Sequence, residues 1–218
     1  MDGSPGRRGA VAQFVLPHVL AHEIRAQPRR ALAVPARRFR LPRRRFPRKA
    51  RPLPSLLTHE EAALLVQLLE RYSLRPSAQA IHLLLLTGAS KAEILGARWE
   101  DLDTERGTLA THSTFTGRAR LIPLNSAAMR LIESLPRKDG VPWLFSSPSG
   151  RQLSSLFYTW DLMRRHIGRP ELRLQDLRHS FANFLMHMGV HTHELRNIMG
   201  HYMPETMAAL RNLPQEKR

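Results

Sequence analysis

The first 55 residues restrict where this chain can fold, because they are rich in proline and arginine and poor in apolar side chains. This segment holds 8 of the 16 prolines, and each proline disfavours a helix interior or a central strand. It also holds 14 Lys and Arg residues against two acidic residues. We therefore interpret residues 1–55 as a basic, extended or disordered arm and residues 56–218 as one compact domain.

The charge of the chain is concentrated in this arm. The formal net charge is +16, yet residues 56–218 hold 20 basic against 16 acidic residues. A basic arm on a nearly neutral domain is typical of polyanion binding, and we expect double-stranded DNA as the partner. Two alternatives stay open, namely an organelle transit peptide, or a leader produced by a GC-rich genome and a misassigned start codon. The candidate DNA contacts in the arm are Arg43, Arg44, Arg45, Arg48 and Lys49.

The composition also limits the class of protein. The chain has no cysteine, which excludes disulfides and thiolate metal sites. This composition is consistent with a protein of a reducing compartment. No apolar run reaches the length needed to span a membrane, and the first residues lack the layout of a signal peptide. We expect a cytoplasmic, nucleoid-associated bacterial protein that does not bind a membrane.

Helix signals begin at Thr58. Thr58 and Glu61 form a capping box, followed by an apolar stripe at helical spacing. A second helix is predicted over 77–86, and a second capping box, from Ser90 to Glu93, opens a third helix that reaches residue 97. The stripe consists of Ala62, Leu65, Leu68, Leu69 and Tyr72.

After these helices the pattern changes to strands. Threonine-rich alternation over 108–114 and 119–124, around the turn at Thr116 and Gly117, predicts a β-hairpin. Five more helices are predicted over 126–135, 153–167, 174–188, 192–199 and 204–213. The fold class is therefore mainly α with a small antiparallel β-sheet formed by the hairpin and a neighbouring strand. In the helix over 153–167 the residues expected to face inward are Leu156, Phe157, Trp160 and Met163.

The order and spacing of several short motifs resemble those of the tyrosine recombinases, the phage integrase family, in their catalytic domain. The resemblance runs from about Leu57 to Leu213. The motifs that carry it jointly are Leu86-Thr87-Gly88, Glu93-Ile94-Leu95, Trp99-Glu100-Asp101-Leu102-Asp103, Thr116-Gly117-Arg118 with Ile122-Pro123-Leu124, Asp176-Leu177-Arg178-His179-Ser180-Phe181 and Gly200-His201.

The resemblance implies a transesterification that needs no metal and no cofactor. In that family a tyrosine attacks a DNA phosphate and forms a covalent phosphotyrosyl link. Two arginines, a lysine and two imidazole-type groups hold the phosphate or move protons. This division of labour has a physical basis, because a tyrosine hydroxyl is a weak nucleophile at neutral pH and the transition state carries extra negative charge.

Only two of these six positions keep the family's residue in this chain. The second arginine is Arg178 and the Gly-His histidine is His201. The four other positions, those of the first arginine, the hairpin lysine, the H-x-x-R opening residue and the nucleophile, hold Ser90, Phe115, Gln175 and Leu210, respectively. The sequence therefore predicts a catalytic domain whose own chemistry is impaired.

Neighbouring residues offer partial substitutes for the missing groups. Lys91 follows Ser90, but one helical step turns a side chain by about 100°. Arg118 and Arg120 could supply the charge of the hairpin lysine but not its proton transfer. Tyr202 is the one tyrosine in the region of the last three predicted helices, residues 174–213, although its register differs from that of the nucleophile. Ser90 itself is better explained as a helix N-cap.

Arg178 and the histidines have more than one interpretation. Arg178 could bind a DNA phosphate or hold its own helix to nearby carbonyl and carboxylate groups, and we favour the phosphate. We expect no metal, because the spacing of the histidines does not place three imidazoles on one face; these are His187, His191, His193 and His201. The candidate DNA contacts in the compact domain are Arg178, His201, Arg118, Arg120 and Lys91.

These observations lead to one preferred function and two alternatives. The preferred function is a DNA-binding protein of a recombination or integration system that has lost most or all strand cleavage and acts as an accessory or regulator. Its protein partner would be an active recombinase or further copies of the same chain on DNA. The first alternative is an active recombinase with displaced residues or a tyrosine supplied in trans. The second is a non-functional remnant of a mobile element.

Overall fold

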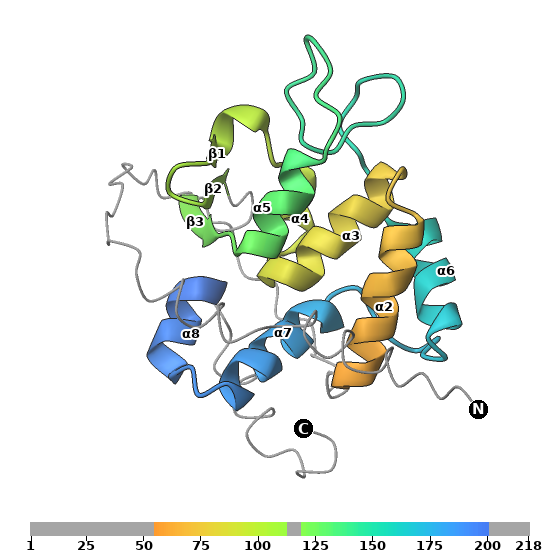
Figure 1. Cartoon of the computed structure of the whole chain (residues 1–218), viewed down its shortest axis with the longest axis vertical. Helices are drawn as coiled ribbons and strands as arrows, with labels where there is room; N and C mark the ends of the chain where they lie inside the picture. The colour runs from red at the N-terminus through yellow and green to blue at the C-terminus, as the bar shows by residue number, and fades with distance from the viewer. Residues whose placement is uncertain (1–54, 113–118, 201–218) are drawn as a thin grey trace, which may run out of the picture.

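The computed structural model describes residues 55–112 and 119–200. The predicted arm up to residue 54, the hairpin tip at Thr116 and Gly117 and the helix predicted over 204–213 lie outside the described residues. Within the described part, helices form most of the domain, and a small sheet lies at one side of it (Figure 1).

The first two helices begin and end as their sequences predict. Helix α2 (His59–Arg71) starts with the Thr58 capping box, in which the Glu61 amide donates to Thr58 Oγ1 at 3.2 Å and the Thr58 amide donates to Glu61 Oε2 at 2.8 Å. Helix α3 (Pro76–Thr87) ends at Gly88, whose φ of 61° suits a residue without a Cβ. Helix α3 packs against α2, α4, α5, α6 and α7 and is the centre of the main core.

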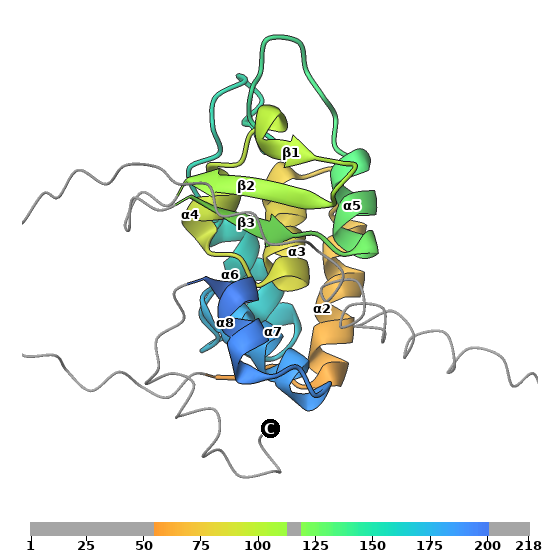
Figure 2. The ribbon, with the colours of Figure 1, turned by 90° about the vertical axis from the view of Figure 1, so that its left-hand side faces the viewer.

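Three antiparallel strands in the order β1-β2-β3 form the sheet. They are β1 (Leu102–Asp103), β2 (Thr108–His112) and β3 (Ala119–Pro123). Leu109 pairs with Ile122, and both are fully buried in the main core. Figure 2 shows the sheet in front of α3. The predicted hairpin and its neighbouring strand are therefore confirmed over the described residues.

The remaining elements around the sheet are short. Helix α4 (Lys91–Leu95) and the 3-10 turn η1 (Trp99–Asp101) lead into β1, and α5 (Ser126–Glu133) follows β3. The side chain of Asn125 caps α5 by accepting from the Ala128 amide at 2.8 Å. This cap is the one that the sequence predicts.

Helix α6 (Phe157–His166) starts later than predicted. Residues 153–155 do not join it, because the Leu153 amide donates to the Phe145 carbonyl at 3.2 Å and Ser155 Oγ accepts from the Phe157 amide at 3.2 Å. The prediction that Phe157 faces inward is wrong, since its exposed fraction is 62%. Leu156, Trp160 and Met163 are buried as predicted.

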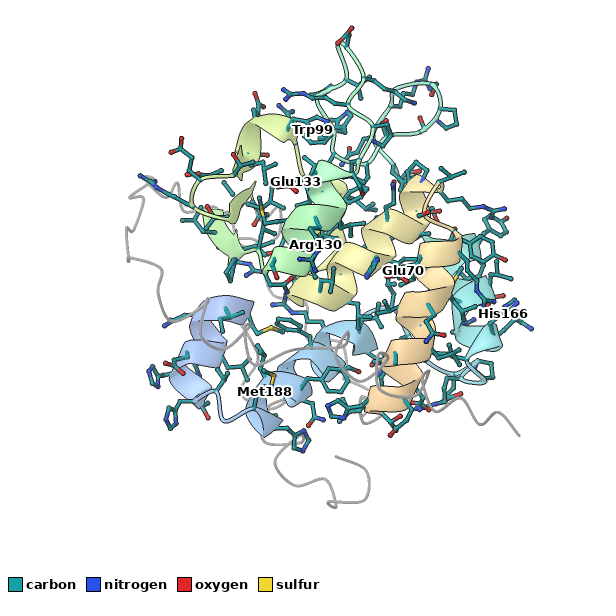
Figure 3. All side chains as sticks on the ribbon, viewed as in Figure 1. Glu70, Trp99, Arg130, Glu133, His166 and Met188 are labelled. Carbon is teal, nitrogen blue, oxygen red and sulfur yellow. The ribbon has the colours of Figure 1, made fainter. Side chains whose placement is uncertain are left out.

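Helices α7 (Asp176–His187) and α8 (Thr192–Met199) pack together over a second, smaller core. Met188, in the connection between them, packs against this core (Figure 3). Helix α7 also packs on α3, and α8 contacts β3, so the pair is joined to both the helices and the sheet. We call the second core the α7–α8 cluster; its buried members are Phe181, Ala182, Leu185, Val190, Leu195, Ile198 and Met199.

The described residues thus form a mainly helical domain with a small antiparallel sheet, as the sequence predicts. Over 55–112 and 119–200, none of the helices has the length and apolar character that crossing a membrane requires.

Candidate functional site

Two arginines from distant parts of the chain converge on one carboxylate, Glu93. Arg120 on β3 donates from Nε to Glu93 Oε1 at 2.6 Å and from Nη2 to Oε2 at 3.0 Å. Arg178 on α7 approaches the same carboxylate, with Nη1 3.7 Å from Oε2. The three side chains are 9% (Glu93), 16% (Arg120) and 20% (Arg178) exposed. We call these three residues the Glu93 cluster.

Local sequence explains why Glu93 is held at this place. It is the third residue of α4, and the Ser90 amide donates to Glu93 Oε2 at 2.7 Å while the Glu93 amide donates to Ser90 Oγ at 3.3 Å. The interpretation of Ser90 as a helix N-cap is therefore confirmed. One carboxylate completes the capping box and also receives two hydrogen bonds from Arg120.

The charge of Glu93 is stabilised by its partners. Burial alone would raise the pKa of Glu93, but the hydrogen bonds and charge of Arg120, with the Ser90 contacts, outweigh it and lower the pKa to about 2. Glu93 is therefore ionised at neutral pH. Two guanidinium groups and one carboxylate leave the cluster with a formal charge of +1.

The same two arginines hold the end of α8. Arg120 Nη1 donates to the Ile198 carbonyl at 2.6 Å, and Arg178 Nη2 donates to the Met199 carbonyl. The last carbonyls of a helix lack partners within the helix and carry partial negative charge, so cations are favoured there. The side chain of Arg120 also lies against Gly200, where an added Cβ would come within 2.9 Å of Arg120 Cδ. The cluster thus fixes the backbone that leads into residue 201.

Arg178 also connects α7 to the end of α3. Its Nη1 donates to the Gly88 carbonyl at 2.6 Å. Gly88 cannot be replaced easily, because a Cβ there would lie 2.3 Å from Phe181 Cδ1. In the described structure these hydrogen bonds of Arg178 are to the protein's own carbonyl groups. A DNA phosphate that binds Arg178 would have to replace or share these hydrogen bonds.

The structure brings together some of the predicted site residues. Ser90, Arg120 and Arg178 meet around Glu93. Lys91 is exposed at the first position of α4, and Gln175 is exposed immediately before α7. The remaining predicted residues lie outside the described residues and stay predictions: Phe115, Arg118, His201, Tyr202, Leu210, Arg43, Arg44, Arg45, Arg48 and Lys49.

Two of the three tyrosines of the chain lie away from the Glu93 cluster. Tyr72 follows α2, and Tyr158 is in the first turn of α6 and is 86% exposed. Helix α6 lies on the side of the domain opposite to α8 (Figures 1 and 2). Among the three tyrosines, Tyr202 is the one that follows α8, the helix whose end Arg120 and Arg178 hold.

The described histidines do not gather into a metal site. The rings of His191 and His193 stack with centroids 6.0 Å apart near the start of α8. Within residues 55–112 and 119–200, no group of three or more His, Cys, Asp or Glu residues could hold a metal ion.

Sequence reasoning missed the central role of Glu93. It assigned this glutamate to a capping box, which is correct, but the cap satisfies only part of a carboxylate that has several acceptor positions. The sequence did contain a signal, because Glu93 lies in a family motif between the end of a helix at Gly88 and the hairpin that carries Arg120. A buried acid at such a place requires basic partners.

Solved structures of recombinases share this fold. A crystal structure of XerA recombinase matches with a TM-score of 0.61 and 17% identity over 78% of this chain and 63% of that one. A XerH site-specific recombinase bound to a palindromic difH substrate matches with a TM-score of 0.63 and 19% identity over 76% of this chain and 52% of that one. The domain therefore has the fold of a tyrosine recombinase catalytic domain.

Sequence comparison gives the family. The tyrosine recombinase XerA of Pyrococcus furiosus is 26% identical over 161 residues, which cover 71% of this chain and 56% of that protein. XerD of Halalkalibacterium halodurans is 28% identical over 171 residues, again 71% and 56%. The chain thus spans little more than half the length of these relatives. The model of the phage integrase family matches residues 55–212, and the chain belongs to that family.

Proposed function

We propose that this chain is a DNA-binding protein of a recombination or integration system, and that it does not cleave DNA with its own residues. The observation that carries this proposal is the Glu93 cluster. Ser90 stands where the family places its first arginine, and its hydroxyl caps α4. The second arginine, Arg178, binds the carbonyls of Gly88 and Met199.

Both the family and the arm support DNA as the partner. Several structural neighbours are recombinases or integrases bound to DNA, among them XerH on a difH substrate and lambda integrase on a COC' core site. The arm carries Arg43, Arg44, Arg45, Arg48 and Lys49 within seven consecutive residues. Neutralisation of phosphates by such groups releases counterions and gives affinity that falls steeply with salt.

The electrostatics of the Glu93 cluster do not favour cleavage. A phosphoryl transition state with extra negative charge needs cations aimed at the phosphate. In the Glu93 cluster the carboxylate offsets one of the two guanidinium charges, and Arg120 donates hydrogen bonds from all three of its nitrogens to protein acceptors. With Leu210 at the position of the nucleophile, the chain is better suited to occupy DNA as an accessory or regulator of an active recombinase.

The salt dependence of binding tests the DNA-binding part. We expect the logarithm of the affinity for a random-sequence duplex to fall linearly with the logarithm of the salt concentration. Replacing the five basic residues Arg43, Arg44, Arg45, Arg48 and Lys49 by Gln should reduce the slope by about 4, whereas Arg178→Gln should reduce it by at most about 1. Binding without a steep salt dependence, or a larger effect of Arg178→Gln than of the five-residue change, would refute the proposal.

A further inference from the structure

We propose that Arg169 is a positioning residue that fixes the point where the basic arm leaves the domain, so that the arm and the domain bind one DNA duplex as a unit. The inference rests on the proposed function, because it concerns how DNA is bound. Arg169 lies in the turn after α6, more than 100 residues along the chain from Glu61 and Ser55, which it holds.

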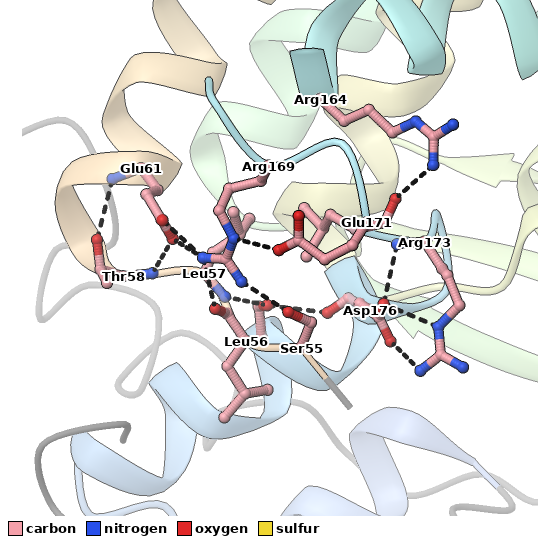
Figure 4. A network of polar contacts seen from close by, with 12 residues as sticks. Ser55, Leu56, Leu57, Thr58, Glu61, Arg164, Arg169, Glu171, Arg173 and Asp176 are labelled. Atoms are coloured by element: carbon pink, nitrogen blue, oxygen red, sulfur yellow. Dashed lines mark hydrogen bonds and ion pairs between the residues drawn. The ribbon is translucent and has the colours of Figure 1, made fainter. Parts of the chain in front are cut away.

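Arg169 ties three parts of the chain together (Figure 4). Its Nη1 donates to both carboxylate oxygens of Glu61 on α2, at 2.6 and 2.7 Å, and its Nε donates to Glu171 at 2.6 Å. Its Nη2 donates to Ser55 Oγ at 2.6 Å, and the Leu56 carbonyl lies 3.4 Å from Nη1. The first described residues of the chain are therefore held by one guanidinium that is 23% exposed.

The next residues are anchored by packing in two directions. Leu57 is buried in the main core, whereas Leu56 packs against the α7–α8 cluster. The Leu57 amide donates to Ser180 Oγ on α7 at 3.0 Å. Because consecutive side chains enter different cores and the backbone is hydrogen-bonded, the direction of the chain at this junction is set.

The junction shares elements with the Glu93 cluster. Helix α7 carries both Ser180, which binds the junction, and Arg178, which belongs to the cluster. Leu56 packs on the same cluster of side chains that contains Ile198 and Met199, whose carbonyls accept from Arg120 and Arg178. The origin of the arm is thus held in a fixed relation to the candidate DNA-binding site of the domain.

The fixed junction affects DNA binding because only a short length of chain separates it from the basic residues of the arm. Lys49, the last candidate DNA contact of the arm, precedes Ser55 by six residues, and Pro52 and Pro54 lie between them. Proline fixes φ and makes a linker less flexible. When two binding elements share one ligand, the effective concentration of the second falls roughly as the −3/2 power of the length of free chain between them. Lengthening that chain should therefore weaken binding without the loss of any contact.

An insertion at the junction gives the first measurement. About eight Gly and Ser residues placed between Pro54 and Ser55 would more than double the free chain from Lys49 to Ser55, so we expect about a fourfold loss of affinity for a fluorescein-labelled random-sequence duplex. The insertion lies outside the hydrogen bonds of Arg169, so the melting temperature should not change.

Arg169→Gln is then measured in the full chain and in the insertion variant. If Arg169 positions the arm, we expect about a twofold loss of affinity in the original chain and no further loss in the insertion variant, where the arm is already uncoupled. If Arg169 only stabilises the fold, the loss of affinity will be the same in both backgrounds, and that result would overturn the inference.

Arg164→Gln is the matched control. Arg164 is 22% exposed, forms an ion pair with Asp161 and donates to the Leu172 carbonyl, and these contacts do not involve the junction residues 55–57 (Figure 4). It should lower the melting temperature and leave the affinity unchanged in both backgrounds. Absence of salt-dependent binding by the unmodified chain would instead refute the proposed function, so the two failures are distinguishable.

Discussion

Replacing Glu93 by Gln should destabilise the domain, because two guanidinium groups would lose their shared counter-charge. Gln keeps the size of the side chain but accepts weaker hydrogen bonds and carries no charge. The lowering of the Glu93 pKa from 4.5 to about 2 corresponds to about 3 kcal/mol of stability at pH 7. Because the cluster is partly reached by solvent, we expect a measured loss of about 2 to 3 kcal/mol.

The pH dependence identifies the charge as the cause. A carboxylate whose folded-state pKa is lowered contributes its full stability above the unfolded pKa of 4.5, and this contribution is lost as the pH falls through about 2. The difference between the original chain and Glu93→Gln should therefore shrink by about half on going from pH 7 to about pH 3.

Urea unfolding followed by circular dichroism at several pH values measures this difference. Glu100→Gln is a suitable control, because Glu100 pairs with Arg98 at 2.8 Å but is 67% exposed, and such pairs contribute at most about 1 kcal/mol. A loss of stability in Glu93→Gln no larger than that in Glu100→Gln, or one that is the same at pH 7 and pH 3, would contradict this prediction.

Three further substitutions have expected outcomes. Ser90→Ala should cost about 1 kcal/mol in urea unfolding, since it removes the N-cap of α4; an unchanged stability would contradict the capping role. Gly88→Ala should lower the melting temperature strongly, because φ is 61° and the new Cβ would meet Phe181; a wild-type value would show that the contact relaxes. Burial lowers the pKa of His82 to about 4. Between pH 6.5 and pH 4 the His82 side chain is therefore protonated mainly in the unfolded state, so unfolding becomes more favourable as the pH falls through this range. His82→Leu should remove this acid sensitivity, and an NMR titration with a pKa near 6.5 would contradict it.

Local signals in the sequence predicted most of the fold. The capping boxes at Thr58 and Ser90, and the cap at Asn125, locate helix starts because each depends on residues three positions apart. The start of α6 could not be predicted in this way, because Leu153 is drawn into a backbone hydrogen bond with Phe145. Periodicity alone cannot detect such a competing contact.

The candidate site was only partly predictable for a related reason. Family positions identify Arg178 and Ser90. The groups that accept hydrogen bonds from Arg178 are the backbone carbonyls of Gly88 and Met199, which no side-chain pattern reveals. Arg169, in the turn after α6, forms hydrogen bonds with Glu61 and Ser55, which are more than 100 positions away in the sequence. Contacts of this kind depend on how the helices pack and become visible only in three dimensions.

A trapping experiment shows whether the chain cleaves DNA with its own residues. The chain is incubated with a pool of random-sequence nicked duplexes, and covalent adducts are separated under denaturing conditions. A variant that restores the four family residues, Ser90→Arg, Phe115→Lys, Gln175→His and Leu210→Tyr, serves as the comparison. We predict that the unmodified chain binds the pool reversibly and forms no adduct. A covalent adduct with the unmodified chain that disappears in Tyr202→Phe would contradict the account.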